Sequence, residues 1–221
     1  MAPVLWTPAA LADQRSGDFD FYVLSLSWSP TYCLGSPSTD TLQCGGRPFA
    51  FVVHGLWPQN EQGYPSDCPS DQGRVARRDI DALLDLMPSP GLIRHEWRTH
   101  GTCSGLDQAS YFALIREARA RVTIPPLFVD LADPLRVSPA AVEQAFISAN
   151  PGLSAAGIAV TCGKGKLKEV RLCMTKDLAW RACPAVDRDA CRQASIVMPP
   201  LRQGNAPERA AQPPARSEIE Q

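Results

Sequence analysis

Eight cysteines constrain the fold of this 221-residue chain more than any other feature. None of them forms a Cys-x-x-Cys pair, which disfavours zinc-knuckle and thioredoxin-type sites. An even number of scattered cysteines predicts structural disulfides and an oxidising compartment, the alternative being eight buried free thiols in a cytosolic protein. Spacing alone leaves about 105 pairings open. The cysteines are Cys33, Cys44, Cys68, Cys103, Cys162, Cys173, Cys183 and Cys191.

Bulk composition predicts one globular domain. Apolar residues make up 44% of the chain, and a net charge of −1 gives no global basic field toward nucleic acid. No stretch approaches the apolar length of about 20 residues that a membrane span requires, so we expect no membrane insertion. We expect an N-terminal extension over residues 1–17, a domain over 18–198 and a disordered, proline-rich tail over 199–221.

Hydrophobic periodicity predicts an α+β fold in which helices pack on a central antiparallel sheet. Residues 60–73 are rich in proline, glycine and serine and predict a loop. The expected strands are Phe19–Trp28, Phe49–Val53, and a hairpin of Ile158–Thr161 with Leu167–Leu172. The expected helices are Asp79–Leu86, Leu92–His100, Ser110–Val122 and Ser138–Ala149.

All three histidines fall in two short segments. His54 ends the second predicted strand, and Gly55 after it indicates a bulge or a close backbone approach. His95 and His100 lie on the second predicted helix, which Gly101 ends. Imidazole titrates near neutral pH, so this pattern points to general acid–base chemistry.

On an ideal helix, Glu96, Thr99, His95 and His100 form one continuous face, and Arg98 lies on the far side. A His-Glu-x-x-His zinc site requires histidines four residues apart, whereas His95 and His100 are five apart, which disfavours a metalloprotease. A structural helix with buried polar groups is a second interpretation. The third, metal-free acid–base catalysis by His100 with His54 across a cleft, accounts best for three histidines and a glutamate.

Both segments resemble the active-site segments of the ribonuclease T2 family. The first, residues 51–58, reads Phe-Val-Val-His-Gly-Leu-Trp-Pro, and the second, residues 95–103, reads His-Glu-Trp-Arg-Thr-His-Gly-Thr-Cys. The resemblance extends upstream to residues 24–33 and downstream to Leu167-x-Glu169-Val170-x-x-Cys173, covering roughly residues 19–191. It implies a ribonuclease T2-like α+β fold and an endoribonuclease that needs no metal or cofactor.

The chemistry suits RNA, because the 2′-hydroxyl is its own nucleophile. The resemblance implies cleavage of single-stranded RNA through 2′,3′-cyclic phosphates to 3′-phosphate ends, with broad base tolerance and no DNA cleavage. It implies His100 as base, His54 as acid and Glu96 as support for the charged transition state. His95 would hold the phosphate, and a base would stack at Trp57, followed by Gln59, with Tyr64. For Trp57, plain core packing stays open.

Two positions depart from the family pattern. Relatives usually carry lysine before the second catalytic histidine, where this chain has Thr99, and many carry aspartate where it has Gln59. The first departure predicts a slower enzyme and leaves a catalytically silent RNA-binding protein as the alternative. Should another basic residue replace the lysine, the segment from Arg74 to Arg78 is the first candidate. This cluster and two others, residues 116–121 and 164–171, are expected to be solvated faces, the alternative being that one of them lies beside the site and binds a polyanion.

The resemblance also implies the disulfide pairs and the compartment. The expected bridges are Cys33–Cys44, Cys68–Cys103, Cys162–Cys191 and Cys173–Cys183. We expect a periplasmic or secreted monomer. The first ten residues lack the pattern of a signal peptide, so the leader would be absent from this chain.

Overall fold

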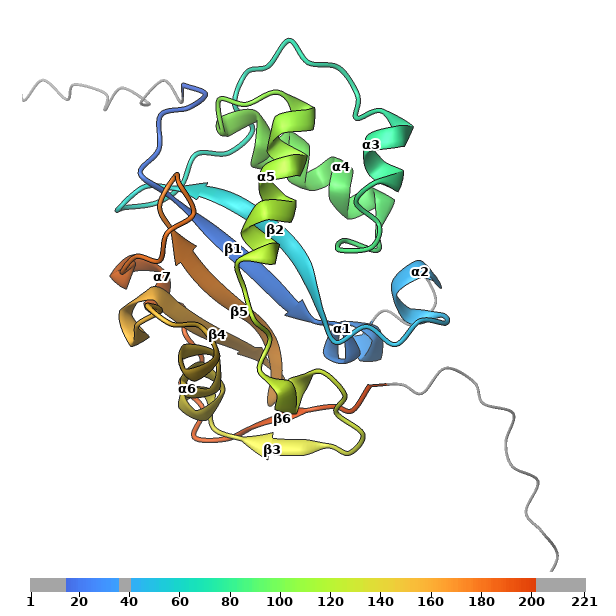
Figure 1. Ribbon diagram of the computed structural model, residues 1–221, viewed down its shortest axis with the longest axis vertical. Coiled ribbons are helices and arrows are strands. Elements are labelled where there is room, and N and C mark those ends of the chain that lie inside the picture. Colours follow the sequence, from blue (N-terminus) through green and yellow to red (C-terminus); the bar gives the residue numbers. More distant parts are fainter. Residues whose placement is uncertain (1–14, 36–40, 202–221) are drawn as a thin grey trace, which may run out of the picture.

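A computed structural model describes residues 15–35 and 41–201 (Figure 1). Its strands are β1 (Phe21–Trp28), β2 (Phe51–Gln59), β3 (Leu135–Val137), β4 (Ile158–Gly163), β5 (Lys166–Met174) and β6 (Ile196–Met198). Its α-helices are α1 (Ser29–Gly35), α2 (Thr41–Cys44), α3 (Arg77–Asp81), α4 (Pro90–Thr99), α5 (Gln108–Ala120), α6 (Pro139–Ala149) and α7 (Pro184–Asp187). None of the helices described could span a membrane.

The six strands form one mixed sheet in the order β2-β1-β5-β6-β3, and β4 pairs with β5. The predicted antiparallel pairing holds for β1 with β2, for β1 with β5 and for the β4–β5 hairpin. The sheet is not wholly antiparallel, because β6 meets the start of β5 in parallel, with Lys166 opposite Val197. The hairpin turns at Lys164 and Gly165, which both adopt positive φ angles, as a two-residue turn between twisted strands requires.

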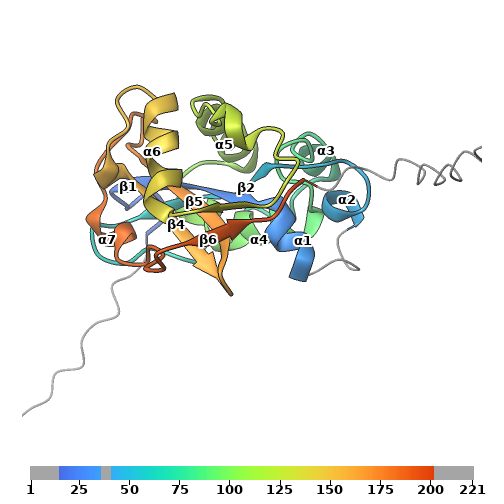
Figure 2. The ribbon, with the colours of Figure 1, turned by 90° about the horizontal axis from the view of Figure 1, so that it is seen from below.

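Helices α5 and α6 cover one face of the sheet and enclose the main core (Figures 1 and 2). The opposite face carries a smaller apolar cluster that includes Val23 and Cys173 and is covered by Val186 of α7. Two layers therefore bury both faces of the central strands β1 and β5. The functional residues described below lie at this second face, where polar side chains interrupt the apolar pattern.

Strand β2 runs six residues beyond the predicted Phe49–Val53 and carries His54 in its interior. The pairing with β1 shifts at this point: Leu26 opposes Val53 and Ser25 opposes Gly55, so His54 has no partner. Such a bulge re-aims a side chain. It also explains why Val53 and Leu56, three residues apart, both join the main core.

Helix α4 begins two residues earlier than predicted because Ser89 caps it by accepting from the Leu92 amide, and Pro90 occupies the first turn. It ends at Thr99, with His100 as the cap residue. Gly101 follows at a close approach: a Cβ atom there would lie 2.4 Å from Cε3 of Trp97. Helix α3 is shorter than the predicted Asp79–Leu86, because the chain continues beyond residue 81 in turns.

Four disulfides join the pairs that the resemblance implies: Cys33–Cys44, Cys68–Cys103, Cys162–Cys191 and Cys173–Cys183. At the N-terminal end of the domain, Ser16 donates to the Thr102 carbonyl. At the other end, residues that the sequence assigned to the tail belong to the fold: Trp28 donates to the Pro199 carbonyl, and the Leu201 amide donates to Leu131. Most of the expected extension and tail, residues 1–14 and 202–221, lies outside the described residues.

Candidate active site

A cleft of about 700 Å³ opens at the second face of the sheet. Its walls come from β2, the loop after it, the end of α4, strand β5 and α7. Six of the eight predicted site residues line it, namely Trp57, Gln59, Tyr64, His95, Thr99 and His100. His54 and Glu96 do not line the cleft but adjoin Trp57, which does.

His54 is held between two carboxylates. Its Nδ1 atom lies 2.7 Å from Oε1 of Glu169, and its Nε2 atom lies 3.8 Å from Oε1 of Glu96. Burial lowers the pKa of His54, but the hydrogen bond and charge of Glu169, with the charge of Glu96, outweigh it and raise the pKa above its usual 6.5. The protonated imidazolium is therefore more favoured here than in a free histidine.

Glu96 is buried, with 1% of its surface exposed. Its Oε2 atom accepts a 2.8 Å hydrogen bond from Nε1 of Trp57. Burial raises the pKa of Glu96 to about 7, while His54 and Trp57 act in the opposite direction. The close approach expected at Gly55 holds this pair together, because a Cβ atom there would lie 1.9 Å from Oε2 of Glu96.

His100 has the opposite electrostatic environment to His54. Burial, with the neighbouring His95 and His54, lowers the pKa of His100 to about 4. Its Nδ1 atom is buried and has no hydrogen-bond partner among the described residues, so Nε2 is the nitrogen that can exchange a proton with the cleft. Near neutral pH this imidazole is therefore uncharged.

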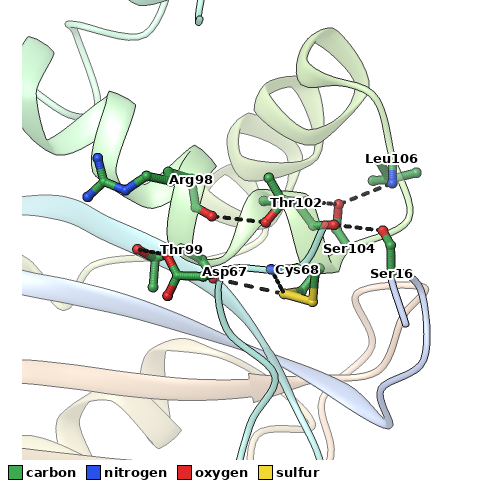
Figure 3. Close-up of a disulfide and its surroundings, with 10 residues drawn as sticks. Ser16, Asp67, Cys68, Arg98, Thr99, Thr102, Ser104 and Leu106 are labelled. Atoms are coloured by element: carbon green, nitrogen blue, oxygen red, sulfur yellow. Dashed lines mark hydrogen bonds between the residues drawn. A yellow bond between two sulfur atoms is a disulfide. The ribbon is translucent and has the colours of Figure 1, made fainter. Parts of the chain in front are cut away.

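The predicted helix face is only partly presented to the cleft. His95 is exposed, and its Nδ1 lies 3.1 Å from an Arg98 guanidinium nitrogen, which can only donate, so Nδ1 accepts. Thr99 is tied to the loop after β2: its Oγ1 donates to Asp67 at 3.4 Å, and its carbonyl accepts from the Asp67 amide at 2.8 Å (Figure 3). A carboxylate therefore adjoins Thr99, the position at which the resemblance leads one to expect a lysine.

Trp57 is the structural centre of the site. Its ring centroid lies 5.3 Å from that of His54 and 5.5 Å from that of His100. The guanidinium carbon of Arg171 lies 5.3 Å above the same ring. Trp57 packs against the second apolar cluster and also lines the cleft, so its ring is both part of the packing and accessible from the cleft. Tyr64 is 58% exposed, and its ring centroid lies 6.4 Å from that of His100.

Sequence reasoning missed the charged residues that β5 contributes. Glu169 is 1% exposed, and Arg171 lines the cleft and donates to its Oε2 atom at 3.0 Å. The signal was present, since these two residues alternate on one side of a strand whose other side, Val170 and Leu172, joins the main core. The expectation of a solvated face is therefore wrong for Arg171.

The other arginine clusters lie away from the cleft. The segment from Arg74 to Arg78, named as a substitute for the missing lysine, contributes no lining residue, and Arg77 pairs with Asp81 instead. The basic residues that line the cleft besides the histidines are Arg171 and Arg188. In the described part of the chain, no group of three or more histidine, cysteine or acidic side chains is arranged to hold a metal ion.

Known proteins that are similar to this chain are ribonucleases. The model of the ribonuclease T2 family matches residues 19–183. A ribonuclease of Aeromonas hydrophila is 42% identical over 116 residues, which are 52% of this chain and 52% of that protein. Ribonuclease DdI of Dictyostelium discoideum is 29% identical over 84% of this chain and 86% of its own.

The fold is also found among solved structures. A variant of RNase MC1, a ribonuclease of bitter gourd seeds, was solved in complex with 5′-GMP. It superposes with a TM-score of 0.62 at 25% identity, covering 80% of this chain and 99% of that one.

The chain spans about half the length of the Aeromonas relative. Because the family model covers both histidine segments and the strand that carries Glu169, the chain belongs to the ribonuclease T2 family.

Proposed function

We propose that this protein is an endoribonuclease that cleaves single-stranded RNA by acid–base transphosphorylation without a metal ion. One observation carries the proposal: two imidazoles contact the same tryptophan beside one cleft, and their pKa values are displaced in opposite directions. Environments that separate two pKa values in this way assign an acid and a base. The nucleotide complex of RNase MC1 and the family membership support RNA as the substrate.

In the first step, neutral His100 accepts the proton of the 2′-hydroxyl, and the 2′-oxygen attacks the adjacent phosphorus. The bond from phosphorus to the 5′-oxygen breaks, and protonated His54 donates its proton to that leaving oxygen. The products are a 2′,3′-cyclic phosphate and a free 5′-hydroxyl. In the second step the roles reverse: His54 takes a proton from water, the hydroxide opens the ring, and His100 protonates the 2′-oxygen to leave a 3′-phosphate.

Glu96 and His95 transfer no proton in this mechanism but stabilise charged groups. The Glu96 carboxyl, 3.8 Å from His54, stabilises its imidazolium and, through Trp57, holds the wall of the cleft. His95 is exposed at the cleft, where it holds the phosphate by donating from Nε2, since Arg98 donates to its Nδ1.

A base stacks on Trp57 and Tyr64, both of which line the cleft beside His100. Gln59 lines the same wall, and its amide both donates and accepts, so it bonds to base edges of either polarity. Broad base tolerance follows. Cleavage of the sixteen ribodinucleotides at equal concentration tests it; rates that differ by more than about 100-fold between bases would show selective recognition.

The proposal is tested by incubating the protein with single-stranded RNA in excess EDTA and analysing the product ends. We expect 2′,3′-cyclic phosphates, no cleavage of the matching DNA, and loss of cleavage in His54→Ala and His100→Ala with unchanged circular dichroism. Cleavage that disappears on chelation would refute the metal-free mechanism. RNA binding without cleavage under any condition would show the silent binding protein instead.

We further propose that the protein works in the periplasm or outside the cell, because four disulfides within one domain are stable in an oxidising environment. We also propose that it is a monomer. Cell fractionation and light scattering test these two statements. Recovery in the reducing cytosol, or a dimer at micromolar concentration, would contradict them.

A further inference from the structure

Glu169 is a buried carboxylate that the acid–base chemistry described above does not use. It is 1% exposed, lies on β5 and bonds through one oxygen to Nδ1 of His54 at 2.7 Å. Its other oxygen accepts from Arg171 Nε at 3.2 Å and from a terminal guanidinium nitrogen at 3.0 Å. An unpaired buried charge is strongly destabilising, so these pairings are required to keep the carboxylate at this position.

We propose that Glu169 is the positioning residue of the acid His54, fixing both the orientation and the tautomer of its imidazole. This proposal deepens the proposed function and rests on it. The carboxylate is ionised, because its pairing with His54 and Arg171 overcomes burial and lowers its pKa to about 2. An ionised carboxylate only accepts hydrogen bonds, so Nδ1 of His54 carries a proton in every protonation state.

The tautomer decides what His54 can do at the cleft. With a proton fixed on Nδ1, the titrating nitrogen is Nε2, which donates its proton in the first step and accepts one in the second. A single ring orientation therefore serves both steps. Rotation about χ2 would break the 2.7 Å bond to Glu169 and bury an unpaired carboxylate oxygen, so the ring stays in place between steps.

Several charged groups influence His54, and among the described residues only Glu169 forms a hydrogen bond with its ring. Glu96 stabilises the imidazolium from 3.8 Å, Lys168 on β5 opposes it, and His100 is uncharged when His54 is protonated near neutral pH. Arg171 acts one step away, because its two hydrogen bonds hold Oε2 of the carboxylate whose other oxygen contacts His54. Removing the charge of Glu169 alone therefore lowers the proton affinity of His54 without opening the cleft.

The direct test is an NMR titration of the intact protein, which needs no activity. With three histidines, selective His→Ala variants assign each imidazole signal. We expect Glu169→Gln to lower the titration midpoint of His54 by about one pH unit or more and to leave that of His100 within about 0.3 unit. The control is Glu143→Gln, a half-buried carboxylate on α6 that bonds to the Val160 amide and has no contact with the site.

The kinetic test separates positioning from stability. Cleavage efficiency falls at high pH as the acid His54 loses its proton, so Glu169→Gln moves this alkaline limb to lower pH and leaves the acidic limb unchanged. An amide that donates to Nδ1 also favours the wrong tautomer, and we expect a loss of about 10²- to 10⁴-fold at pH 7 that shrinks as the pH falls. A purely structural role would lower the rate equally at every pH.

The two measurements distinguish the two hypotheses. A His54 midpoint that does not move in folded Glu169→Gln overturns the positioning role, whatever the protein cleaves. A shifted midpoint with no RNA cleavage in the wild type supports the Glu169–His54 pair and refutes the proposed function instead.

Discussion

The disulfide between Cys68 and Cys103 should stabilise the domain and hold one wall of the cleft. Figure 3 shows it joining the loop that follows β2 to the turn after α4. The same loop carries Tyr64 and Asp67, which line the cleft. Besides the bridge, the Asp67 amide bonds to Thr99, and the Cys68 amide donates to Sγ of Cys103 at 3.2 Å.

The expected magnitude follows from the length of chain that each bridge closes. The separation of Cys68 and Cys103 is 35 residues, for which loop-closure entropy gives about 4 kcal/mol at room temperature. Cys33–Cys44 closes 11 residues, which gives about 3 kcal/mol, and no described residue of α1 or α2 lines the cleft. The second bridge is therefore a matched control for stability without contact to the site.

We expect both double alanine variants to have a lower free energy of unfolding, measured with guanidinium. The variant that lacks Cys68–Cys103 should lose about 1 kcal/mol more than the variant that lacks Cys33–Cys44. Only this variant should lose cleavage efficiency while folded, by about 10- to 100-fold, because a wall displaced by about 1 Å impairs substrate positioning. The assays are equilibrium unfolding and RNA cleavage at a temperature where both variants are folded. Equal losses of cleavage in both, or unchanged cleavage without Cys68–Cys103, would refute the reasoning.

Three further predictions follow from the site. The pH profile of kcat/KM should be bell-shaped. It should rise through the lowered pKa of the base His100, about 4, and fall through the raised pKa of the acid His54, above 6.5. A rate that rises steadily to pH 9 would contradict this pair. Thr99→Lys should raise the rate at low salt, but by less than about tenfold, because the ammonium would pair with Asp67. When Thr99→Lys is combined with Asp67→Asn, the rate should rise by about 10²- to 10³-fold, which is the effect of an electrostatic donor. No gain in the single-turnover rate would show that an arginine already fills that role. Gly55→Ala should abolish cleavage, because the added Cβ atom would displace Glu96. It should also lower the free energy of unfolding by about 1–3 kcal/mol, measured with urea. Wild-type activity in this variant would show that the close approach is not required.

Local sequence signals located the elements that carry the site. Gly101 marks the end of α4, and the alternation of residues 21–28 marks the strand beside β2. Ser89 and Pro90 mark the start of α4, although the predicted helix began only at Leu92. These signals act between residues close in sequence, through capping bonds and side-chain period, so they can be recognised without the fold. The parallel contact of β6 with β5 joins residues about 30 positions apart through the backbone, and no local pattern encodes it.

The sequence by itself singled out three histidines in two segments and a glutamate among them as the residues expected to carry chemistry, and eight cysteines as the residues expected to form disulfides. It did not single out Glu169. Only the tertiary structure decided how each one is tuned. The bulge at His54 brings it to Glu169, 115 residues away, and burial next to His95 and His54 lowers the pKa of His100. Identical side chains thus acquire opposite proton affinities, because a pKa depends on desolvation and on charges within a few ångströms, and both are set by packing between distant segments.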